Sequence, residues 1–262
     1  MFTFITNLPS LQIFLLIFGS GVVIYFLGAW LMLHLFSRRM RSGALAKGAE
    51  EGYKAIIMLT MLLMASSMIR LQSDHRNIED LVEREAMVLI KLDRAFESFE
   101  GQDGQKLRRQ LRNYAELTVS SEWPLLQSGG RSAPVSAALT AMGRGSRLLD
   151  PQSAAQQIAR SEIFSATNQL ADLREVRLTA SHSTGVPMYL WQSILIAILV
   201  GTVVSWFLGT VDRFMLWSIS AITAQALLLT VLIINSNLYG GENAVTPAPI
   251  ERSIALLVPA PA

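Results

Sequence analysis

The feature that most constrains this chain is an uncharged run that continues without a break into a charged one. Residues 55–69 (AIIMLTMLLMASSMI) carry no charge and are apolar on every face of a helix, as a helix surrounded by lipid requires. Charged residues follow from Arg70 to Glu85 with no intervening Gly or Pro, so nothing ends the helix where it leaves the bilayer. The pattern predicts one helix from Tyr53 to about Phe99 that joins a membrane span to a soluble domain.

Composition places the whole chain in the membrane class. Of its 262 residues, 51% are hydrophobic and only 16% are charged, which is too apolar for a soluble protein of this size. The formal net charge is +2, and no basic tract is interleaved with aromatic residues, so nucleic-acid binding is not expected. The absence of cysteine excludes disulfides, thiolate catalysis and cysteine-ligated metals. The expected surroundings are a lipid bilayer.

The order of uncharged and charged segments predicts an all-α, multi-pass membrane protein with four transmembrane helices in two hairpins and an inserted soluble helical bundle. The predicted spans cover residues 11–36, 55–69, 188–210 and 214–236, each uncharged and most of them long enough to cross the hydrocarbon core. The predicted parts are a first hairpin over 1–69, a helical domain over 70–187 that continues from the second span, a second hairpin over 188–239 and an irregular C-terminal tail over 240–262.

Inside the insert, glycine and proline set the predicted helix limits. Gly101 to Gly104 ends the long first helix. The pattern predicts three further helices: one over residues 105–123 that ends at Pro124, a short one interrupted by Gly143 and Gly145, and one that Asp150-Pro151 begins and that extends to about residue 183.

The second span carries a polar stripe. Tyr53, Thr60, Ser67 and Asp74 are spaced by seven and therefore share one slowly drifting side of the helix. Two interpretations stay open. The stripe can line a watery conduction path with Arg70 near its domain-side mouth, or its hydroxyl groups can bind a neighbouring helix, which is the commoner role of Ser and Thr in membranes.

The third span carries small residues at every fourth position. Gly201, Ser205 and Gly209 follow this spacing, which lets membrane helices approach backbone to backbone. We therefore predict a close helix contact along this face.

The short loop between the first two spans predicts the orientation. It contains Arg38, Arg39, Arg41 and Lys47, and positively charged short loops stay in the cytoplasm. This rule places both termini and the helical domain on the outer side of the inner membrane, opposite the cytoplasm.

Enzyme chemistry has little support in this sequence. His34, His75 and His182 lack a metal-ligand spacing, no glycine-rich loop follows a strand, and no Ser or Asp lies in a recognisable nucleophile turn. We predict that the chain is not an enzyme and has no metal site or cofactor.

Several short motifs, in order, carry a resemblance to a known family. They are Val82-Glu83-Arg84-Glu85-Ala86, Leu111-Arg112-Asn113-Tyr114, Ser121-Glu122-Trp123-Pro124, Leu173-Arg174 with Arg177-Leu178, Pro187 with Trp191, and Gly241 with Val245, Pro247 and Pro249. Over about residues 50–255 the chain resembles the DUF4239 or bestrophin-like family of bacterial membrane proteins. It departs from the family pattern where Ser236 and Leu238-Tyr239 follow the last span.

The resemblance implies a distant kinship with bestrophins, which are anion channels built as ring-shaped homo-oligomers whose second span lines the pore. It therefore implies a pentamer-like ring that conducts chloride or other small anions. It also implies a cytoplasmic helical domain, which conflicts with the charge rule, and of the two we favour the charge rule. The expected function is an oligomeric anion channel, and the alternative is a non-conducting membrane scaffold or sensor.

Overall fold

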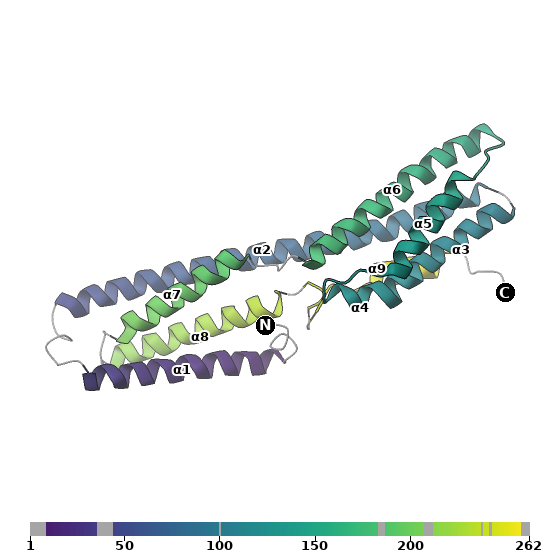
Figure 1. The fold of residues 1–262 in the computed structure, drawn as a ribbon. Helices are drawn as coiled ribbons and strands as arrows, with labels where there is room; N and C mark the ends of the chain where they lie inside the picture. The colour runs from purple at the N-terminus through teal and green to yellow at the C-terminus, as the bar shows by residue number, and fades with distance from the viewer. Residues whose placement is uncertain are drawn as a thin grey trace. The chain divides into compact units, whose positions relative to one another are not determined.

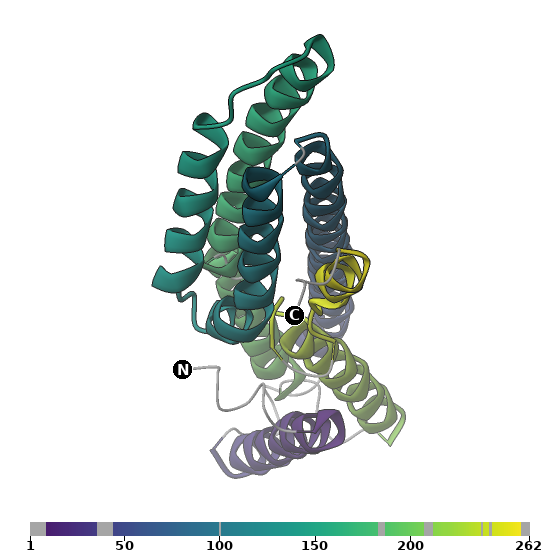
Figure 2. The ribbon, with the colours of Figure 1, turned by 90° about the vertical axis from the view of Figure 1, so that its right-hand side faces the viewer.

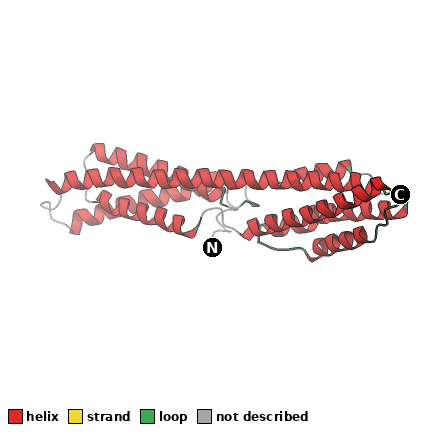
Figure 3. Ribbon diagram, turned by 90° about the horizontal axis from the view of Figure 1, so that it is seen from above, coloured by secondary structure: helices red, strands yellow, loops and turns green. Residues whose placement is uncertain are grey.

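The computed structural model describes residues 9–35, 44–99, 101–182, 187–206, 212–236, 238–240 and 243–257. Every regular element in these residues is a helix (Figure 3), which confirms the all-helical class. The helices are α1 (Ser10–Leu35), α2 (Ala44–Glu97), α3 (Gln102–Leu117), the π-helical turn η2 (Thr118–Glu122), α4 (Trp123–Leu126), α5 (Ala133–Arg147), α6 (Ala154–His182), α7 (Met188–Trp206), α8 (Asp212–Ile234) and α9 (Ala248–Leu256).

The chain forms two compact units, and α2 contributes to both. The first unit comprises Met1–Ser73 and Thr184–Asn243, and the second comprises Asp74–Ser183 and Ala244–Ala262. The continuous helix α2 spans 54 residues with no proline. The uninterrupted pattern predicts this continuity, but α2 begins at Ala44, well before the predicted start at Tyr53. The C-terminal segment therefore belongs to the same unit as the charged insert.

In the first unit, α1, α7, α8 and the early part of α2 lie side by side (Figure 1). Helix α1 packs on α8 and α7, and a buried core joins Met64 and Leu71 of α2 to Ile194 of α7 and Leu232 of α8. Large apolar side chains such as Leu27 nevertheless remain exposed on the outside of the unit. Such a surface needs lipid or another protein to cover it.

Three described helices are long and apolar enough, by length and composition, to cross a membrane. These stretches are Ser10–Gly28, Met188–Ser205 and the apolar part of Glu50–Glu97, and Ser218–Ile234 is a shorter apolar helix. The structure therefore supports a membrane protein with several apolar helices, and the count of four spans remains a prediction.

The second unit is a helical bundle. Helix α3 packs on α5 and α9, and α5 packs on α6 (Figure 2). Fully buried apolar side chains form its core, among them Leu89, Leu92, Leu111, Met142, Ile163 and Leu170.

The break between α2 and α3 depends on two glycines. Gly101 has a φ of 98°, in the left-handed region that glycine adopts readily. A Cβ on Gly104 would lie 2.0 Å from the Phe99 carbonyl oxygen, so only glycine allows α3 to begin this close to the end of α2. The predicted break is found at this position, although Gly104 is already inside α3.

The prediction that Pro124 ends the second helix of the insert is wrong. Helix α3 ends at Leu117, the turn η2 follows, and Pro124 lies in the first turn of α4. Proline is well tolerated there, because the first N–H groups of a helix have no partner within it. The chain turns instead after Leu126, where Gly129 has a φ of 72°.

The predicted interruption of the third helix is also absent, because α5 is continuous through Gly143 and Gly145. A Cβ on Gly145 would lie 2.8 Å from Leu107 Cδ2 of α3. This glycine therefore permits close packing between α5 and α3 rather than ending the helix.

Helix α6 begins at Ala154, not at Asp150-Pro151. The Ser153 hydroxyl accepts a hydrogen bond from the Gln156 backbone N–H at 3.2 Å, and the Gln156 side chain accepts one from the Gln152 N–H at 2.7 Å. This pairing of Ser with Gln three residues later is close to a capping box, and it outcompetes the Asp-Pro start.

The C-terminal tail differs from the predicted irregular segment, since Ala248–Leu256 forms α9. Ile250, Ser253 and Leu257 are buried, so packing in the second unit stabilises this short helix. The predictions that concern Arg38, Arg39, Arg41, Gly209 and Gly241, and the side chain of Lys47, lie outside the described residues.

Candidate functional site

The second unit contains a buried group of charged side chains, which we call the ionic cluster: Glu85, Tyr114, Glu122, Arg174 and Arg177. Glu85 is on α2, Tyr114 is on α3, Glu122 ends η2, and both arginines are on α6. Glu85, Tyr114, Glu122 and Arg177 are fully buried, and Arg174 is 5% exposed. Charged groups are buried to this degree only when they are paired.

Arg177 connects both carboxylates of the cluster. Its Nε donates to Glu85 Oε2 at 2.9 Å and its Nη2 to Glu85 Oε1 at 3.2 Å. The same Nη2 donates to Glu122 Oε1 at 3.0 Å. The Tyr114 hydroxyl adds a hydrogen bond to Glu85 Oε1 at 3.2 Å. Such bidentate arginine–carboxylate pairs are strong and geometrically specific.

Arg174 holds Glu122 from the other side. Its Nε donates to Glu122 Oε1 at 3.1 Å and its Nη2 to Glu122 Oε2 at 2.5 Å. Nη2 also donates to the Ser136 hydroxyl at 2.9 Å, and the Ser132 N–H donates to Glu122 Oε2 at 3.4 Å. Each carboxylate oxygen of the cluster thus accepts at least one hydrogen bond.

The electrostatics of the cluster are balanced, with two carboxylates and two guanidinium groups. Burial disfavours the charged form of Arg177 and by itself would lower its pKa. The electrostatic interactions with Glu85, Tyr114 and Glu122 are stronger than this effect, so the pKa of Arg177 is raised. Burial, followed by the charge of Glu85, raises the pKa of the Tyr114 hydroxyl well above 10.0. The Arg177 guanidinium also lies 5.4 Å from the centre of the Trp123 ring, within range of a cation–π interaction.

Local structure explains how the cluster is positioned. Arg174 and Arg177 are three residues apart on α6 and so share one face. Glu122 ends the π-helical turn, where the Trp123 N–H bonds to the Thr118 carbonyl. π-Helical turns are rare and often lie at functional sites.

The arrangement suits the cluster to hold α2, α3, η2 and α6 together. Both carboxylates of the cluster, Glu85 and Glu122, form ion pairs with arginines. Neither of them is therefore free to act as a general base. Among the described residues, no group of three His, Asp or Glu side chains could hold a metal ion.

Three residues of the polar stripe of α2, namely Tyr53, Thr60 and Ser67, belong to the first unit. Thr60 is fully buried, and its hydroxyl donates to the Ile56 carbonyl at 2.7 Å. Ser67 is 1% exposed and donates to the Leu63 carbonyl at 2.8 Å. Tyr53 is buried as well. This burial favours the helix-packing interpretation of the stripe, and a pore-lining role remains untested.

The two charged residues predicted with the stripe are placed differently. Arg70 is exposed, and Asp74, the first residue of the second unit, is half-buried.

The small-residue face of α7 has a partner in the same chain. Gly201 and Ser205 are buried, and a Cβ on Gly201 would lie 3.3 Å from Ile56 Cγ2 of α2. Gly201 therefore lies close to Ile56 of α2, and a close contact along the whole small-residue face stays a prediction.

Comparison with known protein families finds a match over most of the chain. The model of the bestrophin-like domain matches residues 19–250, which is most of the chain. The chain belongs to the bestrophin-like family. This is the DUF4239 family that the sequence motifs indicate. No curated protein and no solved structure matches the chain.

The structure brings several of the bestrophin-like motif residues together. Glu85, Tyr114, Glu122 and Arg177 form most of the ionic cluster, and Trp123 lies against Arg177. These residues come from four separate motifs, which lie between Val82 and Leu178 in the sequence.

Other motif residues lie outside the cluster. Glu83, Arg84 and Pro124 are exposed. Arg112 pairs with Glu116 at 2.8 Å. The Pro187 carbonyl accepts a hydrogen bond from the Trp191 N–H at 3.3 Å, so it caps the start of α7.

Sequence reasoning did not select every member of the cluster as a site residue. Arg174 belongs to the same motif as Arg177, and the spacing of three residues is a signal that the two share a face. Ser132 and Ser136 carry no such signal, because their role depends only on how α5 packs.

Proposed function

We propose that this membrane protein of the bestrophin-like family assembles with copies of itself into an anion channel in the inner membrane, with the second span, in α2, facing the conduction path. The observation that carries the proposal is the exposed side of that span. Met58, Leu62 and Ile69 are 76%, 65% and 70% exposed, so the described part of their own chain leaves them uncovered.

This face meets the geometric requirement for an axial path between subunits. A side chain that lines such a path is covered by no part of its own chain and is therefore exposed in a single subunit. Leu62 fits this condition, whereas Thr60 and Ser67, on the other side of the same helix, do not. The second span thus lies at the pore, and its exposed face, with Met58, Leu62 and Ile69, lines the path.

An exposed cation lies at the end of this span. Arg70 is exposed and forms no ion pair within the described residues. A fixed positive charge near the mouth of a path raises the local anion concentration, and salt screens this effect. This charge supports anion rather than cation selectivity.

Single cysteines can test which face of α2 meets water, because the chain has no cysteine of its own. In reconstituted bilayers, a membrane-impermeant thiol reagent should reduce the current of Leu62→Cys and leave that of Thr60→Cys unchanged. Block of Thr60→Cys alone would place the polar stripe at the path. Block of neither variant, with current present, would remove α2 from the path.

Selectivity gives a second test. Under a chloride gradient, Arg70→Glu should shift the reversal potential toward cation preference, because it replaces an attractive charge with a repulsive one. Arg252→Glu, an equal charge change at an exposed position on α9, is the control and should have no effect. Wild-type protein that assembles but carries no current would exclude the channel and favour the scaffold or sensor.

A further inference from the structure

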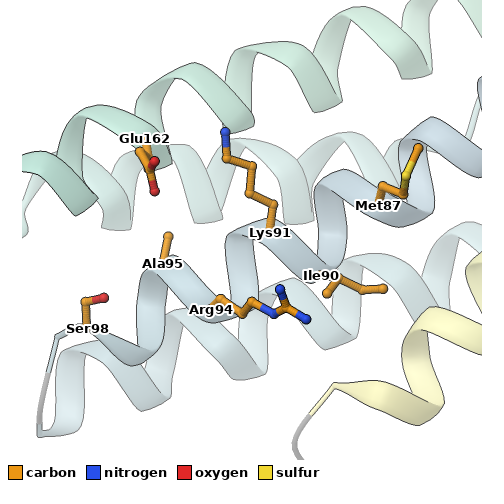
Figure 4. A pocket seen from close by; sticks show the side chains of 7 residues that line it. All are labelled: Met87, Ile90, Lys91, Arg94, Ala95, Ser98 and Glu162. Atoms are coloured by element: carbon orange, nitrogen blue, oxygen red, sulfur yellow. The ribbon is translucent and has the colours of Figure 1, made fainter.

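The second unit has a pocket of about 410 Å³ (Figure 4), and its lining contains no residue of the ionic cluster. Helix α2 supplies most of its lining, and Ser98, directly after α2, and Glu162 of α6 supply the rest. The volume is within the range of pockets that hold small molecules.

Two cations of α2 line this pocket. Lys91 and Arg94 are three residues apart and exposed, so they share a face of the helix. Within the described part of the chain, neither forms an ion pair. Asp93, which lies between them in the sequence, accepts two hydrogen bonds from Arg108, both at 2.7 Å.

The charge of the lining favours an anion. Lys91 and Arg94 together with Glu162 give the pocket a net formal charge of +1. A guanidinium group offers a planar set of donors that matches a carboxylate, and an ammonium group adds a point charge. The Ser98 hydroxyl, also in the lining, can donate a further hydrogen bond.

The remaining lining is apolar. Met87, Ile90 and Ala95 contribute to the walls, and a methionine side chain adapts readily to different apolar shapes. A bare inorganic ion would leave this surface without a partner. The lining therefore matches a molecule with one anionic end and an apolar body.

From these observations we infer that the pocket between α2 and α6 binds a small organic carboxylate with an apolar body. The charged ends of Lys91 and Arg94 point in different directions in Figure 4, and their long, flexible side chains turn toward the carboxylate to pair with it. The apolar body lies against Met87 and Ile90. This inference does not depend on the proposed channel, because binding can be measured without current.

The test uses the full chain in lipid nanodiscs and ligand-observed ¹⁹F NMR. The probe is 4-fluorobenzoate, and 4-fluorobenzamide is its neutral analogue of nearly equal shape. We expect the benzoate to bind at least about tenfold more tightly, since charge-assisted hydrogen bonds are about twice as strong as neutral ones. Equal binding of the two probes would overturn the inference.

Variants of the lining give changes in opposite directions. The double variant Lys91→Gln/Arg94→Gln should weaken benzoate binding by about tenfold or more. Glu162→Gln should strengthen it several-fold, because it removes a like charge from the pocket. A gain in affinity cannot result from misfolding, so this variant keeps the test decisive even where the double variant is unstable.

Two controls complete the experiment. Lys106→Gln/Arg109→Gln removes the same two charges from exposed positions of α3 outside the lining and should leave binding unchanged. Loss of binding in this control would mean that net charge alone attracts the probe. Inorganic phosphate should compete poorly, and competition as strong as that of unlabelled benzoate would contradict a role for the apolar wall.

Discussion

Glu122 is the single residue on which the ionic cluster most depends, since it neutralises both Arg174 and Arg177. Replacing it with Gln leaves the two buried guanidinium groups with one carboxylate between them. Breaking a buried pair in this way costs about 3–5 kcal/mol. We therefore expect Glu122→Gln to lower the free energy of unfolding by about that amount, measured by chemical denaturation of the purified protein.

The exposed pair of Arg131 and Glu175 provides a matched control. Arg131 Nη2 lies 2.7 Å from Glu175 Oε1, but both side chains are more than half exposed. Solvent screens such pairs, whose contribution is about 0–1 kcal/mol. Glu175→Gln should therefore change stability little, and equal losses in both variants would show that burial of the cluster has no special role.

The raised pKa of the Tyr114 hydroxyl leads to a prediction of how the stability of the second unit changes at high pH. Burial and Glu85 raise the pKa of its hydroxyl well above 10.0 in the folded chain, whereas in the unfolded chain the hydroxyl ionises near pH 10. The unfolded state alone therefore releases this proton above about pH 10, and the stability present below that pH is progressively lost as pH rises.

Tyr114→Phe isolates this effect. Near pH 7 the variant should be less stable by about 0.5–1.5 kcal/mol, because it loses the hydrogen bond to Glu85. Between pH 9 and 11 the difference in unfolding free energy between wild type and variant should shrink. A difference that stays constant over this range would mean that Tyr114 ionises equally in both states.

Among the helices, the contact between α7 and α2 can be tested at Gly201. A larger side chain there meets Ile56 Cγ2, which lies 3.3 Å from the position of a Cβ. Overpacking of this kind costs about 1–3 kcal/mol. We expect Gly201→Leu to lower the thermal stability of the detergent-solubilised protein, and Ile56→Ala to restore part of it.

Gly19 is the control for this contact, because a Cβ there would meet no atom within 4 Å. Gly19→Leu should leave thermal stability near that of the wild type. If Gly201→Leu instead reduced the oligomer size and left the stability of the subunit unchanged, the small-residue face would act between subunits.

For the whole chain, the charge rule predicts that the helical domain lies outside the inner membrane. A single cysteine at Ser42 reports on the loop between the first two predicted spans, and one at Ser128 reports on the domain. Ser128 is exposed and is preferable to Gly129, whose φ of 72° disfavours a side chain.

If the charge rule holds, a membrane-impermeant thiol reagent added to intact cells should label Ser128→Cys and not Ser42→Cys. Labelling after cell lysis confirms that both thiols are reactive. The reverse pattern in intact cells would support the orientation implied by kinship with bestrophins.

Local pattern alone was sufficient for the class of the fold and for most of its helices. The uncharged runs predict α1, α7 and α8 to within a few residues. The unbroken pattern from Tyr53 predicts that α2 is continuous, but not that it begins at Ala44. These features depend on hydropathy and on where Gly and Pro stand, which neighbours in the sequence determine. The family also follows from short motifs in a fixed order.

Tertiary structure decided which side chains are buried and which meet. Glu85 and Arg177 are 92 positions apart, and only the packing of α2 against α6 turns two separate motifs into one ionic cluster. The same holds for Thr60, whose spacing is compatible with either a water path or a protein interior. Thr60 is buried in the folded chain, and its neighbours in the sequence could not determine this, because desolvation depends on what covers a residue in space.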